Sequence, residues 1–257
     1  MKPINTLITI LFILLLSSPS WSVTLGDLVE RDGLYYEKFT DVPFSGEVTG
    51  QFQGSIKNGK EEGAWVRYHK NGQLMGKVNF ENGKEQGAFV SYDSTGQLQE
   101  KGTYKNGKQE GAWVDYWDNG QLKGKGTYKN GKEEGAWLTY DTAGQLWFIR
   151  NFKNGNVDEM DMYFHNGQVK NKGKFKNAKR DGAWIHYYEN GQVKSKGSYE
   201  NSKRKGDWTY YHENGQLRYE GDYENGKKEG AWVGYYKDGT VNKELTGTFK
   251  DGVKISD

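Results

Sequence analysis

The chain has 257 residues, of which 34% are hydrophobic and 15% aromatic, with a formal net charge of +2 at pH 7 and a mean hydropathy of −0.97. This composition excludes a thick aliphatic core, so tyrosine, tryptophan and phenylalanine must supply much of the buried surface. The sequence contains no cysteine, which excludes disulfides, thiol catalysis, cysteine metal sites and a lipid-modified cysteine.

The N-terminal segment differs in kind from the rest of the chain. Lys2 precedes an apolar run, Leu7 to Leu16, and small polar residues ending at Ser22 follow it. This layout is typical of a secretory signal peptide cleaved before Val23, and the run is short for a membrane span. We therefore predict a signal peptide at 1–22 and an exported protein, periplasmic or extracellular. The alternative is that the segment stays as an N-terminal membrane anchor.

The rest of the chain is a tandem repeat. One turn, based on Asn-Gly-Gln, recurs in steps of 24 residues with one step of 23, with its glycine at Gly72, Gly96, Gly120, Gly144, Gly167, Gly191, Gly215 and Gly239. A second turn, based on Asn-Gly-Lys, recurs half a period away, at Asn58, Asn82, Asn106, Asn130 and Asn225. Because Asn-Gly accepts the positive φ values of tight hairpins, two turns per period predict two antiparallel strands per period.

The predicted fold class is all-β, an elongated single-layer antiparallel meander of about eight tandem β-hairpins. We assign residues 23–45 to an N-terminal cap or half-repeat, 46–252 to the repeats and 253–257 to a C-terminal tail. The first and last strands of such an open sheet carry unpaired amides, which permits self-association through the ends.

The length of the Asn-Gly-Gln loop decides which side chains share a face of the sheet. With a three-residue loop, one buried face carries Ala112, Val114, Tyr116, Leu122, Gly126 and Tyr128. With a two-residue loop, Trp113 and Trp117 join Leu122 and Tyr128 instead. We favour the three-residue loop, which predicts that the tryptophans lie on the opposite face, beside Lys123 and Lys125.

Two sets of residues are candidates for binding. The first is the column of regularly spaced aromatic residues, which either stack on a ligand or stabilise a sheet that has no second layer: Trp65, Phe89, Trp113, Trp137, Trp184, Trp208 and Trp232. The second is the one repeat that loses a residue and breaks the pattern, which is either sequence drift or a bend or partner site: Trp147, Phe148, Asp158, Glu159 and Asp161.

The repeat unit resembles a known family. Residues 111–122 read Gly-Ala-Trp-Val-x-Tyr-x-x-Asn-Gly-Gln-Leu, and 126–135 read Gly-x-Tyr-x-Asn-Gly-Lys-x-Glu-Gly. This unit is similar to the bacterial MORN-repeat variant from about Gly46 to Gly252. The resemblance implies a single-layer, twisted hairpin sheet. Bacterial members are often labelled YwqK-type antitoxin components, and eukaryotic MORN proteins are linked to membrane attachment, phospholipid contact and scaffolding.

No catalytic constellation accompanies the repeats. The four histidines fall in different columns or distant repeats, so the sequence predicts no metal site, no cofactor and no enzyme. Loss of the signal peptide leaves 35 basic against 34 acidic residues, which gives no bias towards nucleic acid. The leading hypothesis is an exported scaffold for protein–protein interaction. The alternatives are attachment to phospholipid or cell-wall glycan through the tryptophan and lysine face, and antitoxin-like neutralisation of a toxin. The sequence leaves the ligand and the oligomeric state open.

Overall fold

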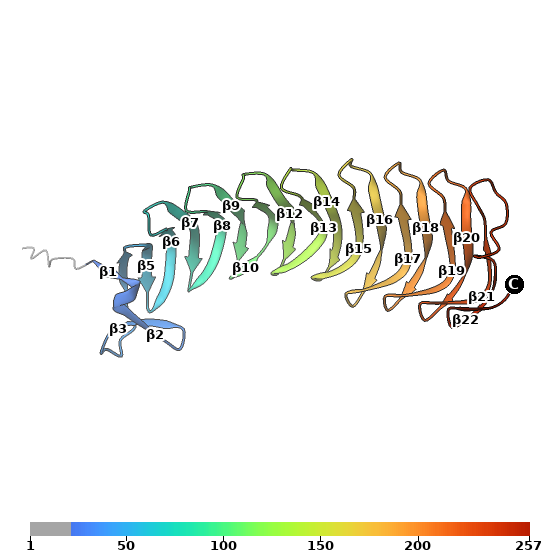
Figure 1. The fold of residues 1–257 in the computed structure, drawn as a ribbon. Helices are drawn as coiled ribbons and strands as arrows, with labels where there is room; N and C mark the ends of the chain where they lie inside the picture. The colour runs from blue at the N-terminus through green and yellow to red at the C-terminus, as the bar shows by residue number, and fades with distance from the viewer. Residues whose placement is uncertain (1–21) are drawn as a thin grey trace, which may run out of the picture.

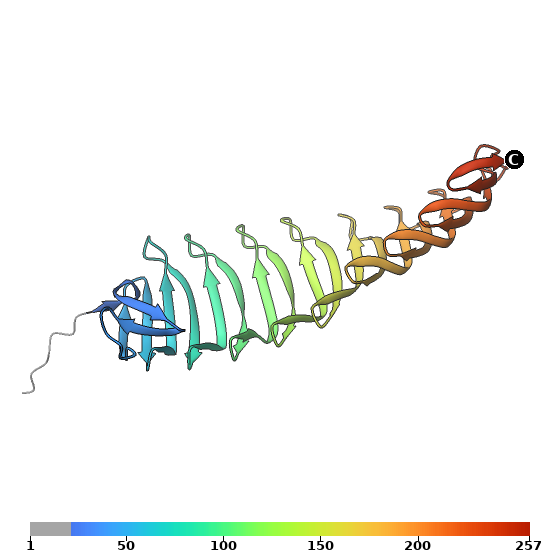
Figure 2. The same cartoon turned by 90° about the horizontal axis from the view of Figure 1, so that it is seen from below.

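The computed structural model describes residues 22–257, so the predicted signal peptide lies outside it except for its last residue. Successive hairpins form one long, open sheet that is curved across its width and twists along its length (Figures 1 and 2). The predicted all-β, single-layer meander is confirmed. Within 22–257 no helix has the length and apolar character that a membrane crossing requires.

The strands follow one another with short turns between them. The N-terminal elements are β1 (Val23–Thr24), the 3-10 helix η1 (Leu25–Asp27), β2 (Leu28–Arg31), β3 (Leu34–Glu37), β4 (Gly46–Thr49) and β5 (Phe52–Lys57). The next strands are β6 (Lys60–Tyr68), β7 (Leu74–Glu81), β8 (Lys84–Tyr92), β9 (Leu98–Lys105), β10 (Lys108–Gln109), β11 (Gly111–Tyr116), β12 (Leu122–Lys129) and β13 (Lys132–Tyr140). The C-terminal strands are β14 (Leu146–Lys153), β15 (Asn156–Tyr163), β16 (Val169–Lys176), β17 (Lys179–Tyr187), β18 (Val193–Glu200), β19 (Lys203–Tyr211), β20 (Leu217–Glu224), β21 (Lys227–Gly234), β22 (Gly247–Lys250) and β23 (Val253–Ser256).

The N-terminal segment covers one end of the sheet. Strand β1 pairs in parallel with β4, whereas the pairs from β4 to β23 are antiparallel, and β2 with β3 forms a separate hairpin. The Tyr35 N–H donates to the Gly59 carbonyl at 2.8 Å, and the Gly59 N–H donates to the Phe44 carbonyl at 2.7 Å. These bonds hold the segment against the first turn of the array.

The two turns have different geometries. At the Asn-Gly-Lys turn, Asn106 and Gly107 have φ values of 52° and 75°, as a two-residue hairpin turn requires. At the Asn-Gly-Gln turn, the Trp117 N–H donates to the Gln121 carbonyl at 2.8 Å, and the Gly120 N–H donates to the Trp117 carbonyl at 2.8 Å. The predicted three-residue loop is therefore confirmed.

The face predicted from that loop is wrong, because a β-bulge follows it. Tyr116 pairs with Leu122, but Asp115 pairs with Gly124, so one extra residue lies between them on β12. The extra residue reverses the alternation, and Trp113 comes to lie directly opposite Gly126. The same register shift precedes the last residue of β6, β8, β13, β15, β17 and β19.

The tryptophans therefore share a face with the second aromatic column. We call it the aromatic face, and its second column consists of Phe80, Tyr104, Tyr128, Phe152, Phe175, Tyr199, Tyr223 and Phe249. The Trp113 ring meets those of Tyr104 and Tyr128 edge-on, at centroid distances of 5.3 and 5.7 Å. Ala112 lies on the opposite face, which we call the outer face, and is exposed.

Each indole lies flat on a glycine of the preceding strand. A Cβ at Gly126 would stand 2.2 Å from Trp137, and the same conflict arises at Gly54, Gly102, Gly173, Gly197 and Gly221 with their own tryptophans. The Trp137 indole N–H donates to the Thr127 carbonyl at 3.1 Å. Glycine thus lets an indole sink against bare backbone, which buries it without a second layer.

Two repeats lack this glycine–tryptophan pair, and in each of them other residues stand at the glycine position and at the tryptophan position. In one, Val78 stands at the glycine position and Phe89, a smaller ring, at the tryptophan position. In the irregular repeat, Arg150 replaces the glycine and Met160 the tryptophan, and the two residues pair across β14 and β15. In both repeats, a side chain at the glycine position is thus accompanied by the loss of the indole at the tryptophan position.

Glutamates of the Lys-x-Glu-Gly motif connect neighbouring repeats. The Asn130 N–H donates to Glu110 at 2.7 Å, and the Asn154 N–H donates to Glu134 at 2.8 Å. Glu62, Gln86, Asp181 and Glu229 accept equivalent bonds from the next turn. The charged motif therefore links each turn to the next rather than forming a ligand site.

We predict that Gly126→Val lowers the free energy of unfolding by about 1–3 kcal/mol, because the added methyl groups overlap the Trp137 indole. Adding Trp137→Phe recreates the native Val78 and Phe89 pair and should restore at least half of the loss. Urea denaturation measures both effects. Thr127→Val, on the outer face of the same strand, should change stability by less than about 0.5 kcal/mol. No recovery in the double variant would contradict the pairing.

A second prediction concerns a turn with strained backbone. Ala178 has φ of 59° at a position that is Ser202 in the next repeat and glycine in the others. Glycine adopts this conformation without steric cost, so Ala178→Gly should stabilise the chain by about 0.5–1 kcal/mol in thermal or urea unfolding. Ala183→Gly, within strand β17, should act in the opposite direction. Destabilisation by Ala178→Gly would show that the turn carries no strain.

Candidate functional site

The candidate tryptophan column forms the floor of the aromatic face rather than an exposed ligand surface. Trp113, Trp184, Trp208 and Trp232 are each 1% exposed, and Trp65 and Trp137 are 2% and 6% exposed. Phe89 is half-buried. The prediction that these rings lie opposite the core, beside Lys123 and Lys125, is wrong, because the β-bulge after the loop places the tryptophans on the face of the second aromatic column. Their direct availability to a ligand is correspondingly small.

The irregular repeat does not gather its candidate residues into one site. Trp147 is the extra residue of the bulge, is 47% exposed and packs at 4.4 Å against Phe148, which lies on the aromatic face. Glu159 and Asp161 lie on the outer face, and Glu159 pairs with Lys174 at 3.5 Å. Burial raises the pKa of Asp161, Lys172 opposes the rise, and Glu159 adds to it.

Asp158 completes the irregular repeat. It occupies the position that Glu134 holds in the preceding repeat, where the carboxylate accepts a bond from the following turn. The residue lost from this repeat also reduces the register shift between β14 and β15 to one residue, from two between β12 and β13. The repeat is thus a structural discontinuity in the array.

The aromatic face carries a charge column that sequence reasoning missed. This column is the residue after the turn lysine in Asn-Gly-Lys-x, or after Asn156 in the irregular repeat. Its members pair across the strands with the second aromatic column, except that Glu61 pairs with Ile56. From the N-terminus it reads Glu61, Glu85, Gln109, Glu133, Val157, Arg180, Arg204 and Lys228. The sign of the charge reverses at the irregular repeat. The change from glutamate to arginine and lysine is present in the sequence, but it is recognisable as one charged surface only after this column is assigned to the aromatic face.

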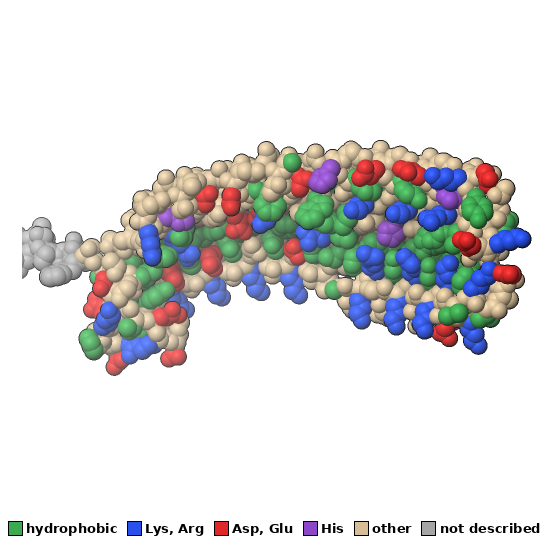
Figure 3. Space-filling view, in the orientation of Figure 1, with side chains coloured by type: hydrophobic (Ala, Val, Ile, Leu, Met, Phe, Trp, Pro, Cys, Tyr) green, Lys and Arg blue, Asp and Glu red, His purple; other side chains and the backbone are tan. Residues whose placement is uncertain are grey.

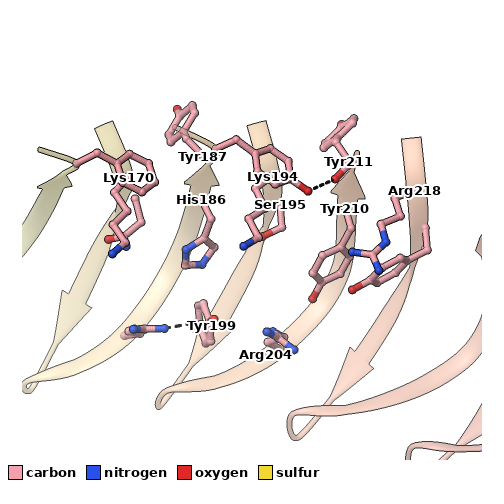
Figure 4. Close-up of a pocket in the computed structure, with 15 residues that line it drawn as sticks. Lys170, His186, Tyr187, Lys194, Ser195, Tyr199, Arg204, Tyr210, Tyr211 and Arg218 are labelled. Atoms are coloured by element: carbon pink, nitrogen blue, oxygen red, sulfur yellow. Dashed lines mark hydrogen bonds between the residues drawn. The ribbon is translucent and has the colours of Figure 1, made fainter. Parts of the chain in front are cut away.

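A hollow of about 410 Å³ lies over β16 to β20, and we call it the C-terminal hollow. Figure 4 shows His186, Tyr199 and Arg204 projecting into it from three successive strands. No aspartate or glutamate is among its lining residues, which include five lysines and arginines: Lys170, Arg180, Lys194, Arg204 and Arg218. In the space-filling view, hydrophobic and basic side chains occupy this recess (Figure 3).

The cations of the C-terminal hollow are held on aromatic rings. The Arg180 guanidinium lies 4.7 Å from the Trp184 ring centroid, and its Nη1 donates to the Tyr199 hydroxyl at 3.4 Å. Arg204 repeats the arrangement one repeat later, 5.1 Å from the Trp208 ring. Stacking fixes the positions of the positive charges, which in solvent would move with flexible side chains.

His186 lies between two of these indoles. Its ring centroid is 6.0 Å from that of Trp184 and 6.4 Å from that of Trp208. Burial lowers the pKa of His186 to about 4, and the charges of Arg180, Arg204 and Lys194 add to the shift. The imidazole is therefore neutral at pH 7.

A second hollow, of about 510 Å³, lies over β8, β9, β11 and β12 and is acidic. Its lining includes Glu100 and Asp115. The Trp113 indole N–H donates to Glu100 at 2.6 Å. Burial raises the pKa of Asp115, and Glu100 raises it further. The two hollows thus present opposite charges along one continuous face.

The histidines do not form a metal centre. His69 Nε2 lies 2.9 Å from the Tyr92 carbonyl, and His212 Nε2 lies 3.0 Å from the Tyr235 carbonyl, so both link neighbouring repeats. Over residues 22–257, no three histidine, aspartate or glutamate side chains are grouped as a metal site requires.

Comparison with known proteins identifies the repeat. A family model described as the MORN repeat variant matches residues 61–82, 85–106, 109–130, 133–154, 180–201 and 204–225. No curated protein matches the chain significantly. Solved structures that are similar include "Crystal structure of GtfA/B complex bound to UDP and GlcNAc", with 14% identity, coverage of 43% of this chain and 22% of that one, and a TM-score of 0.21. Another is "Crystal Structure of TcdB2-TccC3-Cdc42", with 16% identity, coverage of 74% and 12%, and a TM-score of 0.20. This chain thus spans under a quarter of either chain, and TM-scores this low do not indicate a common fold.

The lowered pKa of His186 predicts a pH-dependent contribution to stability. Between about pH 6.5 and pH 4 the unfolded chain binds a proton at this residue that the folded chain does not, so stability falls as pH falls through this window. His186→Gln should remove this component, and the melting temperature of the wild type should decline relative to the variant between pH 7 and pH 4. His165→Gln, at an exposed ring, should follow the wild type. Parallel melting curves for wild type and His186→Gln would refute the assignment.

Proposed function

The chain belongs to the MORN repeat variant family, and on that premise we propose that it is a non-catalytic scaffold that binds a partner protein along its aromatic face. A repeat β fold of this family suggests a scaffold rather than a catalyst. Each repeat adds two strands to the same sheet, so the array forms a long binding surface rather than a single deep cavity.

One observation supports this proposal above the others. The aromatic face is continuous across the array and holds two hollows of opposite charge, lined by tyrosine, arginine, aspartate and glutamate side chains. Tyrosine and arginine are enriched where proteins bind proteins, and complementary charge sets the orientation of a bound partner. A partner that lies along this face would meet both signs of charge.

We further propose that the protein acts after export, in the periplasm or outside the cell, from the layout of residues 1–22. Neutralisation of a toxin would be one form of partner binding on this face. Attachment to membrane or glycan through exposed tryptophans gains no support, because the indoles of the column lie in the floor of the face. Partner binding therefore remains the leading proposal.

Site-specific photocrosslinking in the native host tests the proposal. Benzoylphenylalanine placed at Ser91 and Tyr219 reports on the acidic and basic hollows of the aromatic face. The same group at Thr127 and Ser198 reports on exposed outer-face positions of β12 and β18, the strands that line the acidic and basic hollows. We expect discrete protein adducts from the first pair, because a partner lying along the face would contact both hollows.

The outer-face positions serve as the matched control for this experiment. Adducts from Thr127 and Ser198 alone would place the partner on the outer face and contradict the proposal. Adducts to lipid or glycan, rather than protein, from Ser91 and Tyr219 would replace it with one of the alternatives. Mass spectrometry distinguishes the three results.

A further inference from the structure

The reversal of charge at the irregular repeat divides the aromatic face into two surfaces. Glu61, Glu85 and Glu133 precede Val157 in the charge column, and the basic residues follow it. Overall the chain is nearly neutral, with 36 basic and 34 acidic residues, so the separation arises from position and not from composition. A separation of this kind creates a local field that composition alone does not reveal.

The three cations of the C-terminal half lack anionic partners. Within 22–257, none of Arg180, Arg204 and Lys228 takes part in an ion pair. Each instead stacks on the rings around it, as Lys228 does at 4.2 Å from Trp232 and 4.7 Å from Phe249. Arg204 and Lys228 are partly buried, whereas Arg180 is exposed. Partly buried cations without counter-charges are costly, and an anionic ligand would offset that cost.

The repeat sets the distance between these cations. Arg180, Arg204 and Lys228 lie at the same position of β17, β19 and β21, two strands apart, which corresponds to about 10 Å. A polypeptide in the extended polyproline II conformation rises about 3.1 Å per residue with three residues per turn, so every third side chain recurs on the same side at about 9 Å. A peptide running along the array can therefore place one carboxylate at each cation.

The surroundings of the cations also suit an extended chain. Tyr188 donates its hydroxyl to the Tyr211 carbonyl at 2.8 Å, which joins adjacent repeats along one side of the hollow. Ser195 and Tyr210 are buried on its floor, and His186, which pairs with Ser195 across the strands, is neutral and adds no charge. The site therefore combines an uncharged floor with a row of fixed positive charges.

We propose that the C-terminal half of the aromatic face binds an extended acidic peptide segment whose carboxylates recur at every third residue. Arg180, Arg204 and Lys228 each bind one carboxylate. This inference rests on the proposed function, since it specifies the chemistry of the partner and the half of the face that receives it.

Fluorescence anisotropy with the purified full chain and labelled peptides of about twelve residues tests the inference. One peptide carries glutamate at every third position among glycine and serine, and its isomer carries the same glutamates as one contiguous block. We expect the spaced peptide to bind at least roughly tenfold more tightly, because only it matches all three cations at once.

Paired substitutions locate the binding. Arg180→Gln with Arg204→Gln should weaken binding of the spaced peptide by roughly tenfold or more. Lys172→Gln with Lys196→Gln removes the same charge from strands β16 and β18. It should change affinity less than about twofold, because these lysines lie on the outer face, next to Gly173 and Gly197 of the aromatic face. Circular dichroism of each variant verifies that the fold is retained.

Several results would overturn the inference. Equal affinity for the two peptides, equal losses in the two double variants, or no binding of the spaced peptide would each reject the carboxylate spacing. If Arg180→Gln with Arg204→Gln instead converts a dimer of the chain to a monomer in analytical ultracentrifugation, the occupant is a second copy and not a peptide. These failures are distinct from failure of the proposed function, which requires loss of protein adducts in the crosslinking experiment.

Discussion

The contact between an indole and a bare glycine backbone is the constraint on which the rest of the structure depends. A single-layer sheet has no facing layer, so it must bury its aromatic surface against its own backbone. Glycine at Gly126 and its equivalents gives the indole that surface, and the edge-on tyrosine and phenylalanine rings cover what remains. The contact is repeated by each regular period, and every column on the face takes its position from it.

The same arrangement explains how a nearly neutral chain presents strong local charge. The charge column lies beside the second aromatic column, and its three cations, Arg180, Arg204 and Lys228, each lie over a ring. Rings accept stacked cations readily, whereas carboxylates on this face are desolvated, as the raised pKa values of Glu133 and Asp115 indicate. The residues that pack the aromatic face thus change little from repeat to repeat, whereas the residue in the charge column changes in sign and type.

Local signals predicted the strands, both turns and the three-residue loop, because Asn-Gly dictates backbone conformation within a few residues. The buried face could not be predicted in the same way. Its assignment depends on one unpaired residue after the loop, which is Lys123 in the third complete repeat. A lysine at this position does not indicate a β-bulge. The columns that contain Gly126 and Trp137 could have identified the buried face. Val78 and Phe89 replace the two residues together, which indicates that the two positions are in contact. The wrong face led to a wrong candidate site, because the burial of the tryptophans and the position of the charge column both depend on which face is buried.

The irregular repeat has a consequence for the array as a whole. In a tandem array, cooperativity passes from each repeat to the next through nearest-neighbour contacts. The aromatic packing is divided at this point, with Trp113, Trp137 and Phe152 in one cluster and Trp184, Trp208 and Trp232 in another. Met160 and Arg150 lie between them in place of an indole and a glycine. We therefore expect side-chain packing to couple the repeats on either side less strongly here than within each half, although the strands remain paired, and this point coincides with the boundary between the acidic and basic surfaces.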